Sequence, residues 1–470
     1  MMKSKEDLEA EFLEYGQEHV FRHWPLLSPQ EAEEFLDQLR EVDLSRCLKA
    51  WNQSQKVIPT QTIFEKAKSF DGTNPVSSDL SDYRKLGEEI LASGSVAAFT
   101  VAGGQGTRLG HDGPKGTIKC TPLSQKSLFH YFTENLKFHS EKYGYVFNWF
   151  IMTSKANHSQ TTNYFTEEGF FGYPPEKIHF FEQGMIPVFD KNGKFLLAKK
   201  NKLAMSPDGH GGSLEALKKA GIIKLMAEED IKYLSYFQVD NPMVNCLDPT
   251  FVGLHSYHSS EMSSKAVKKV NPEEKVGTFV SENGKVKVIE YSDLPQEVAQ
   301  KKDERGFLNH GLGSIAIHIL SRSFMEKVLS QEDEQLPFHP AHKAVPCINN
   351  DGISISPTEP NGVKLETFIF DALPKAQNSL ILEVSREEEF APIKNKTGDD
   401  SLHSSTQLQT KRACRWLDDS KIARSTDKIE ISPLYSPSFY EFNQKSEKLR
   451  DRLPINQPTV FDENGPTVNF

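Results

Sequence analysis

The sequence predicts an α/β protein built around a mainly parallel sheet. Between residues 95 and 239, short apolar runs alternate with stretches of helical periodicity, as the strand–helix–strand units of a parallel sheet require. The first run, residues 95–102, is short and apolar and ends in glycines, which is typical of a strand buried on both faces. With 37% hydrophobic and 26% charged residues, the chain of 470 residues has the composition of a globular protein.

Residues 1–90 are expected to form a helical N-terminal region. Ser28 can cap a helix and Pro29 can take its first position. Four apolar residues then recur at helical spacing, namely Phe35, Leu36, Leu39 and Val42.

Residues 91–385 are expected to form the catalytic domain. Its first strands are predicted at residues 95–102, 147–153, 177–183 and 233–239, and its helices at 126–139, 157–168 and 211–230. An Asn-Gly pair between two β-rich runs predicts a hairpin over residues 280–286. Later elements are expected at residues 364–373 and 379–385.

Residues 386–470 are expected to form a small C-terminal domain. The polar stretch 395–412 is interpreted as a mobile loop or the start of a helix. The last part of the chain, with its scattered prolines, is interpreted as β-rich.

The charge balance limits the classes of partner. Lys and Arg number 55 and Asp and Glu 65, a formal net charge of −10, which argues against nucleic acid or an anionic membrane as a partner. A local basic pocket for phosphates remains compatible with that charge.

Cysteines and terminal sequence predict a cytoplasmic protein. The five cysteines stand far apart without a CxxC pair, as in a protein whose thiols stay reduced. The acidic first residues show no signal peptide, and no window approaches about 18 uninterrupted apolar residues.

The clearest chemical signal is the loop Ala102-Gly-Gly-Gln-Gly-Thr-Arg-Leu-Gly110, followed by Pro114-Lys-Gly116. Glycines let the backbone approach a ligand closely, and successive N–H groups in such a loop form an anion-binding concavity. Arg108 and Lys115 add positive charge where phosphates would lie. The loop follows a buried strand, at the edge where open α/β sheets bind ligands.

The segment VAGGQGTRLGHDGPKG resembles the signature of the UDP-sugar pyrophosphorylases, which are uridylyltransferases. Further blocks, from about residue 15 to 435, resemble the eukaryotic-type UDP-N-acetylglucosamine pyrophosphorylase branch. They are YGQEHVFRHW, WFIMTS, FFEQGMIPVFD, KNKLAMSPDGHGG, VDNPMV, VGTFV, VIEYSDL, NGVKLETFIFD and EFAPIKN. The resemblance implies a Rossmann-like nucleotidyltransferase core (GT-A-like) with a mostly parallel mixed sheet.

In this family an oxygen of a sugar 1-phosphate attacks the α-phosphorus of UTP and pyrophosphate leaves. The resemblance implies that Gly103, Gly104 and Arg108 hold the triphosphate. It also implies that Lys115 neutralises charge at the α-phosphate, and that Lys394 contacts the reacting phosphate from the C-terminal side.

The resemblance assigns other residues to the nucleotide and the metal. Gln183 offers an amide donor and acceptor to uracil, and Gly209 lies in the loop 206–212 that passes the uridine and the sugar. Asp240 ends an apolar run, and its carboxylate is the expected ligand of the Mg²⁺ cofactor.

For the sugar, the resemblance indicates Gly277, Glu290, Tyr291 and Asn309, while the alternating Phe368 and Phe370 divide between pocket wall and core. His210 stands where the family's N-acetylglucosamine enzymes usually have Asn, and Leu312 replaces a second Asn in the block around Asn309. Glucose-specific and broad-specificity relatives have Gly-His-Gly at the first of these sites, so the sugar stays open between N-acetylglucosamine, N-acetylgalactosamine and glucose.

The expected function is therefore a uridylyltransferase that joins UTP and N-acetylglucosamine 1-phosphate. The alternatives are a glucose-specific or broad UDP-sugar uridylyltransferase and an inactive sugar-nucleotide-binding regulatory protein. The expected partners are UTP and a sugar 1-phosphate, in a monomer or weak homo-oligomer.

Overall fold

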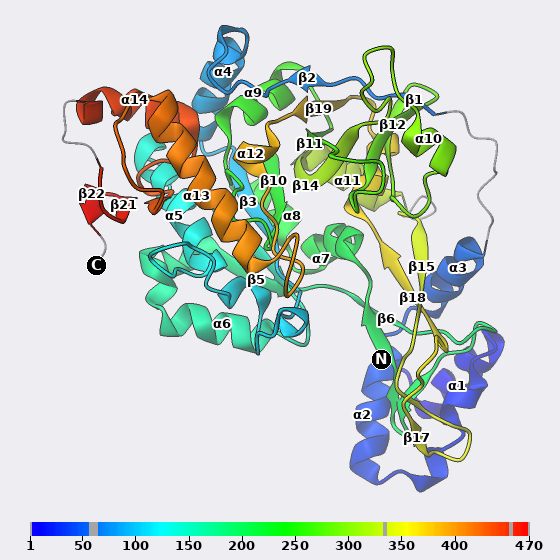
Figure 1. Cartoon of the computed structure of the whole chain (residues 1–470). Coiled ribbons are helices and arrows are strands. Elements are labelled where there is room, and N and C mark those ends of the chain that lie inside the picture. The colour runs from blue at the N-terminus through cyan, green and yellow to red at the C-terminus, as the bar shows by residue number, and fades with distance from the viewer. Residues whose placement is uncertain (1, 56–63, 332–335, 451–454, 469–470) are drawn as a thin grey trace. The chain divides into compact units, whose positions relative to one another are not determined.

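The computed structural model describes residues 2–55, 64–331, 336–450 and 455–468 (Figure 1). The chain divides into two compact units, each built from three separate segments. The first unit comprises residues 1–62, 183–216 and 332–371, and the second comprises residues 63–182, 217–331 and 372–470. The domain limits expected at residues 90 and 385 stay a prediction, because compact packing does not by itself define functional domains.

An eleven-stranded sheet forms the centre of the second unit. Its main path runs β2-β19-β11-β14-β10-β3-β4-β5, and β1, β12 and β13 branch from this path where β12 pairs with β14. Strands β10, β3, β4 and β5 are parallel to one another. Strand β14 runs antiparallel to both β10 and β11. The sheet is thus mixed but mostly parallel, which confirms the predicted fold class.

The strands predicted from apolar runs are all present. They are β3 (Val96–Val101), β4 (Trp149–Thr153), β5 (Ile178–Glu182) and β10 (Tyr233–Gln238). The expected hairpin is formed by β12 (Thr278–Glu282) and β13 (Lys285–Ile289). Asn283 and Gly284 between them have φ values of 51° and 75°, as a tight hairpin turn requires.

The predicted helices are present with one difference. Helices α5 (Leu128–Tyr143) and α6 (His158–Glu167) cover the expected segments. The single helix expected over residues 211–230 is two helices, α7 (Ser213–Lys219) and α8 (Ile222–Glu228). Gly221 between them has φ +75°, a left-handed conformation that interrupts the helix and that glycine adopts without strain.

Other elements complete this part of the second unit. The remaining strands of the sheet are β1 (Glu65–Lys66), β2 (Phe70–Asp71), β11 (Met262–Lys268), β14 (Leu312–Ser321) and β19 (Ser379–Glu383). The remaining helices are α4 (Ser81–Ala92), α9 (Pro249–Tyr257), α10 (Gln296–Gln300), α11 (Arg322–Ser330) and α12 (Arg386–Glu389).

The C-terminal part of the second unit combines a small sheet with two long helices. The three strands are β20 (Ile429–Ile431), β21 (Thr459–Asp462) and β22 (Gly465–Val468). They are accompanied by α13 (Leu402–Asp419) and α14 (Phe439–Arg450). Trp416, Phe442 and Phe461 lie in their common core. The segment 395–412, interpreted as a loop or helix start, thus contains the first half of α13.

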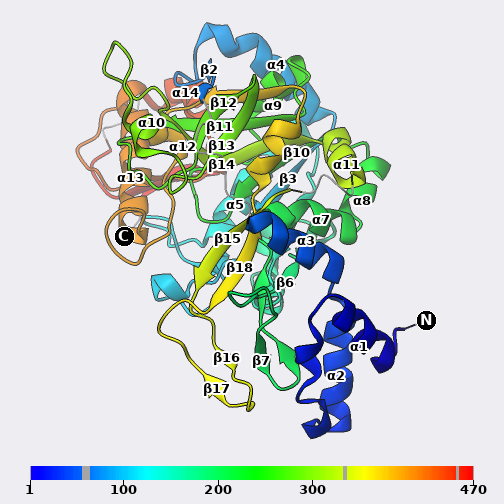
Figure 2. The ribbon, with the colours of Figure 1, turned by 90° about the vertical axis from the view of Figure 1, so that its right-hand side faces the viewer.

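The first unit packs three N-terminal helices against β-hairpins from later segments. The helices are α1 (Lys5–Glu14), α2 (Pro29–Arg40) and α3 (Leu44–Ser54). The strands are β6 (Met185–Pro187), β7 (Leu197–Lys199), β8 (Lys202–Leu203), β9 (Met205–Pro207), β15 (Phe338–Lys343), β16 (Cys347–Ile348), β17 (Ser354–Ile355) and β18 (Gly362–Thr367). Figure 2 shows α3 beside the β15–β18 hairpin.

The predicted start of α2 is confirmed. Ser28 caps the helix with a reciprocal hydrogen bond to Glu31, and Pro29 is its first residue. Phe35, Leu36 and Leu39 are buried in the core of the first unit. Among the described residues, no helix has both the length and the apolar character needed to cross a membrane.

Candidate active site

The glycine-rich loop, residues 102–116, follows β3 and is closed by backbone hydrogen bonds. Gly106 N–H donates to Gly113 O at 2.9 Å, and Lys115 N–H donates to Gly104 O at 3.1 Å. Gly113 has φ +138°, a conformation that favours glycine. The two arms of the loop are therefore held together while Gly104 and Arg108 stay exposed.

Asn157 braces the start of this loop from the neighbouring strand. Its Nδ2 donates to Ala102 O at 2.9 Å and to Gly104 O at 3.2 Å, while its Oδ1 accepts Ser154 N–H at 2.8 Å. The residue is 1% exposed. Sequence reasoning missed Asn157, although an Asn in the short turn between a buried strand and a helix is a signal for such a role.

Lys115 and Asp240 face each other at the carboxyl ends of two parallel strands. Strand β3 leads to the loop and β10 leads to Asp240, and their pairing continues where Val239 N–H donates to Val101 O at 3.1 Å. Lys115 Nζ lies 3.8 Å from Asp240 Oδ2. A Cβ on Gly104 would lie 3.9 Å from Lys115 Cε, so the lysine side chain passes beside the loop backbone.

The backbone at Lys394 reaches Asp240 from the C-terminal side, while the Lys394 ammonium lies 5.6 Å from the centroid of the Phe390 ring. Ile393 N–H donates to Asp240 O at 2.9 Å, and Lys394 N–H donates to Asp400 O at 2.6 Å. Burial raises the pKa of the Asp400 carboxyl, the positive charge of Lys394 opposes the rise, and the negative charge of Asp240 adds to it. The second unit thus brings Lys115, Asp240 and the Lys394 backbone together, while the roles expected of these residues stay predictions.

The residues predicted for the sugar in this unit fall into two groups. A Cβ on Gly277 would lie 3.4 Å from Glu290 Oε1, so these two predicted residues are close neighbours across the β12–β13 hairpin. Tyr291 follows Glu290 and is 43% exposed. Asn309 lies in another segment, where its N–H donates to Lys301 O at 2.8 Å.

The remaining predicted residues, Gln183, Gly209, His210 and Phe368, belong to the first unit. Gly209 has φ +86°, and a Cβ there would lie 2.4 Å from Thr367 O. Thr367 N–H donates to Asp208 O at 2.8 Å. The glycines of the turn 206–212 therefore allow it to lie directly on the end of β18, next to Phe368.

His210 contacts the rings of Phe368 and Phe370 and accepts a backbone hydrogen bond. Its ring stacks on Phe368 at a centroid distance of 5.3 Å and meets Phe370 edge-on at 5.7 Å. Its Nδ1 accepts Ile369 N–H at 3.2 Å. Burial lowers the pKa of His210 to about 4, so the ring is neutral near pH 7 and carries its proton on Nε2.

Asp208 belongs to the turn 206–212 and packs next to the Gln183 segment. A Cβ on Gly184 would lie 2.3 Å from Asp208 Oδ2, so residues 183–184 pack on the turn. Burial raises the pKa of Asp208 to about 6, opposed by the Arg46 guanidinium, whose Nη2 lies 3.8 Å from Asp208 Oδ2. Sequence reasoning assigned no role to either residue. Arg46 lies in a helix whose sequence shows no functional pattern, so its approach to Asp208 could not be recognised.

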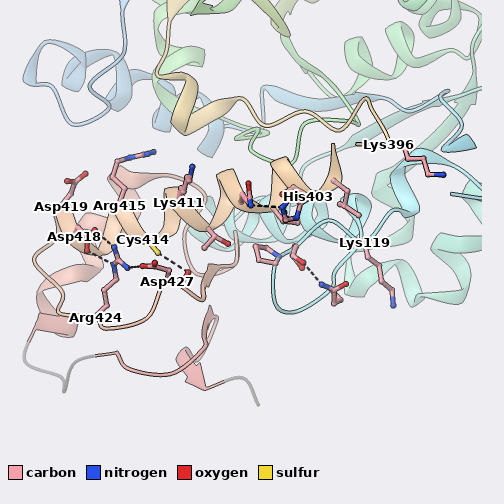
Figure 3. A pocket seen from close by; sticks show the side chains of 17 residues that line it. Lys119, Lys396, His403, Lys411, Cys414, Arg415, Asp418, Asp419, Arg424 and Asp427 are labelled. Carbon is pink, nitrogen blue, oxygen red and sulfur yellow. Dashed lines mark hydrogen bonds and ion pairs between the residues drawn. The ribbon is translucent and has the colours of Figure 1, made fainter. Parts of the chain in front are cut away.

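A groove of about 1100 Å³ lies along α13, within the second unit (Figure 3). Arg424 bonds to Asp418 and Asp427 at one end, and Lys119 and Lys396 lie at the other. None of the residues predicted for the site lines this groove. The candidate active site is the cluster around Lys115 and Asp240. The groove adjoins its loop at Lys396, since a Cβ on Gly110 would lie 3.5 Å from Lys396 Cε.

Comparisons with known proteins identify the family of the chain. The family model described as UTP–glucose-1-phosphate uridylyltransferase matches residues 50–461. The UDP-N-acetylglucosamine pyrophosphorylase of Saccharomyces cerevisiae is 34% identical over 476 residues, covering 96% of this chain and 99% of the relative. The UDP-N-acetylglucosamine diphosphorylase 2 of Arabidopsis thaliana is 33% identical over 425 residues, covering 86% and 83%.

A solved structure shows the same fold. The uridine diphosphate N-acetylglucosamine pyrophosphorylase from Trypanosoma brucei, in complex with an inhibitor, superposes with a TM-score of 0.81 at 24% identity. The match covers 97% of this chain and 98% of that one. On the family match and these sequence identities, the chain belongs to the UTP–glucose-1-phosphate uridylyltransferase family.

Proposed function

We propose that this protein transfers the uridylyl group of UTP to N-acetylglucosamine 1-phosphate, forming UDP-N-acetylglucosamine and pyrophosphate. The observation that carries the proposal is the meeting of Lys115, Asp240 and the Lys394 segment beside the glycine-rich loop. Relatives over 30% identical that are named UDP-N-acetylglucosamine pyrophosphorylase or diphosphorylase support the choice of sugar.

The reaction exchanges one phosphoanhydride bond for another. An oxygen of the sugar 1-phosphate bonds to the α-phosphorus of UTP, the bond from that phosphorus to the β-phosphate bridging oxygen breaks, and pyrophosphate leaves with the electron pair. Negative charge gathers on the α-phosphate and the leaving group, so preorganised cations lower the barrier. Lys115 and Lys394 supply those cations, and the loop N–H groups with Arg108 orient the triphosphate.

We propose Asp240 as the protein ligand of Mg²⁺. Its side chain is 12% exposed and lies 3.8 Å from the Lys115 ammonium. Among the described residues, no group of three or more His, Cys, Asp and Glu side chains is suited to a metal. One carboxylate fits Mg²⁺, which commonly binds through one or two carboxylates with phosphates and waters completing the octahedron. The ion, when bound, neutralises phosphate charge.

Asp240→Asn is therefore expected to weaken metal binding. In the presence of UTP, titration with Mn²⁺ as a paramagnetic probe should show at least about tenfold weaker binding in the variant than in the unaltered protein. Dialysis against EDTA should abolish turnover, and added Mg²⁺ should restore it. Equal Mn²⁺ affinity in both proteins would remove Asp240 from the metal site.

The second candidate function is transfer to glucose 1-phosphate or to several sugar phosphates. The observation that favours it is His210, which stands in the turn 206–212 in place of the Asn usual in N-acetylglucosamine enzymes. Its Nδ1 accepts the hydrogen bond from Ile369 N–H. A sugar hydroxyl would therefore contact His210 at the Nε2–H edge or at the ring face.

A pyrophosphate-release assay with UTP and three sugar 1-phosphates tests both candidates. We expect the largest kcat/KM with N-acetylglucosamine 1-phosphate, compared with the N-acetylgalactosamine and glucose compounds. A preference for glucose 1-phosphate would establish the second candidate. Absence of turnover with all three, in protein that still binds UTP, would point to the inactive regulatory alternative.

A cytoplasmic location is part of the proposal. Its support is that all five cysteines are free and buried, as in proteins of reducing compartments.

A further inference from the structure

Lys265 is a cation buried in the middle of β11. Its side chain is 0% exposed. The ammonium Nζ lies 2.7 Å from Asp248 Oδ2 and 2.6 Å from Glu389 Oε2. Although burial favours the neutral amine, the two carboxylates raise the pKa of Lys265 above its usual value. A charged lysine therefore joins two segments that are far apart in the sequence.

At one end of this ion cluster, Asp248 caps the N-terminus of α9. Asp248 is the N-cap of α9, and its Oδ1 accepts Thr250 N–H at 2.9 Å. The other end holds α12, whose last residue is Glu389. Figures 1 and 2 both show α12 beside β11. Lys265 thus links the central sheet to the beginning of α9 and to the end of α12.

Glu389 is also the first residue of the stretch that leads to Lys394. Asn241 spans this stretch: its Nδ2 donates to Glu389 O at 2.7 Å, and its Oδ1 accepts Ala391 N–H at 3.0 Å. Two residues later, Ile393 N–H donates to the backbone oxygen of the residue before Asn241. Residues 389–393 therefore lie along the segment that carries Asp240.

Stability alone does not explain a fully buried ion cluster of this kind. Desolvation offsets much of the attraction, and hydrophobic replacements of similar volume are often neutral or stabilising. The cluster does fix the position of Glu389, because the Lys265 ammonium donates short hydrogen bonds to both Asp248 and Glu389. That position sets the register of the five residues that follow.

We propose that Lys265, through Glu389, is a positioning residue for catalysis. The ion cluster holds the stretch 389–394 against Asp240 and Asn241, and so places the Lys394 ammonium where the reacting phosphate binds. This inference rests on the proposed function, in which Lys394 contacts that phosphate.

Glu389→Gln is the principal test. The amide keeps the shape of the side chain and leaves Lys265 paired with Asp248. We expect kcat to fall by about tenfold to a hundredfold, as misplacement of a reacting group does, with KM for UTP little changed. If circular dichroism shows that the Lys265→Met variant is folded, its kcat should fall in the same way, again with little change in KM for UTP. Lys268→Met is the matched control on the same strand, since Lys268 is 71% exposed and pairs with Glu383, and it should behave as the unaltered protein.

A double variant separates positioning from a general loss of structure. If Glu389 acts by placing Lys394, Glu389→Gln combined with Lys394→Ala should be no slower than Lys394→Ala alone. Effects that multiply in the double variant would overturn the inference, as would normal kcat in folded Glu389→Gln while Lys394→Ala is slow. Normal turnover of Lys394→Ala itself would contradict the proposed role of Lys394, and the inference with it.

Discussion

Lys115 and Asp240 face each other across 3.8 Å at the ends of two parallel strands. Without a ligand, each charge is partly satisfied by the other, which costs less than leaving either unpaired in a half-buried site. A triphosphate would offer the lysine a more highly charged partner. The pair is therefore suited to exchange its internal contact for contacts with substrate.

Lys115→Ala should lower kcat by more than about tenfold, up to about a thousandfold, the range for removal of one transition-state donor. The reason is the loss of a positive charge beside the expected position of the phosphates, next to the Asp240 carboxylate. Steady-state pyrophosphate release measures the effect. Lys119→Ala, at an exposed position of the α13 groove, is the control and should turn over normally. Near-normal turnover of the Lys115→Ala variant would show that Lys115 has no part in the mechanism.

Asp208 predicts a pH dependence of stability. Burial raises its pKa from 3.8 to about 6 in the folded protein, so folding favours the protonated carboxyl. The contribution to stability is full below the unfolded pKa and is lost as the pH rises through the folded pKa. The two pKa values imply a loss on the order of 3 kcal/mol between about pH 4 and 6.

Asp208→Asn should abolish that part of the pH dependence. Urea unfolding at several pH values between about 4 and 7 should show the free energy of unfolding of the unaltered protein falling relative to the variant. Parallel curves for the two proteins would show that Asp208 has no raised pKa.

At the scale of elements, α4 and α9 pack through two glycines. A Cβ on Gly253 would lie 1.7 Å from Tyr83 O, and one on Gly87 would lie 1.8 Å from Pro249 O. Both distances are far below van der Waals contact, and the obstructing atoms are backbone. The helices are therefore closer than any side chain at these positions would allow.

Gly253→Ala should destabilise the protein by about 3 kcal/mol, at the upper end for overpacking, because the two helices must separate to admit the methyl group. The midpoint of urea unfolding measures the change. Glu89→Ala, on the exposed side of α4, should leave the midpoint nearly unaltered. A Gly253 variant as stable as this control would mean that the helices separate without cost.

The elements differ in how far the sequence predicts them. Buried runs such as β3 and β10 are recognisable because parallel strands covered on both faces are apolar throughout. The break at Gly221 was not predicted, because glycine within a helical pattern is often tolerated. Lys265 was not recognised as buried, because a lysine in a strand is ordinarily exposed and its two carboxylate partners are not adjacent in the sequence.

At the scale of the whole molecule, the position of Lys115 near Asp240 could be predicted. The glycine-rich motif follows one buried strand and Asp240 follows another, and the two strands are parallel neighbours. The grouping of α1, α2 and α3 with hairpins from residues 183–216 and 336–371 could not be predicted. It depends on packing between segments more than a hundred residues apart, as Phe12 against Phe195 shows. Arg46 beside Asp208 is a contact of the same kind.

The cysteines give a prediction for the molecule as a whole, since they are spread over both units. All five are free and buried, and burial raises the pKa of Cys47 to about 12. We expect almost no rapid reaction with a thiol reagent in the folded protein and five reactive thiols after unfolding in urea without reductant. Fewer than five would reveal a disulfide and contradict a reducing compartment.

The hydrogen bond from Ile393 to the backbone of Asp240 has a consequence for synthesis. A ribosome completes the glycine-rich loop early, but Asp240 lacks this partner until residue 393 has left the exit tunnel. A nascent or prematurely released chain therefore carries the glycine-rich loop without Ile393 and Lys394, which complete the cluster. We therefore expect a chain truncated before residue 393 not to turn over UTP, because Asp240 then lacks the hydrogen bond from Ile393 and the chain lacks Lys394.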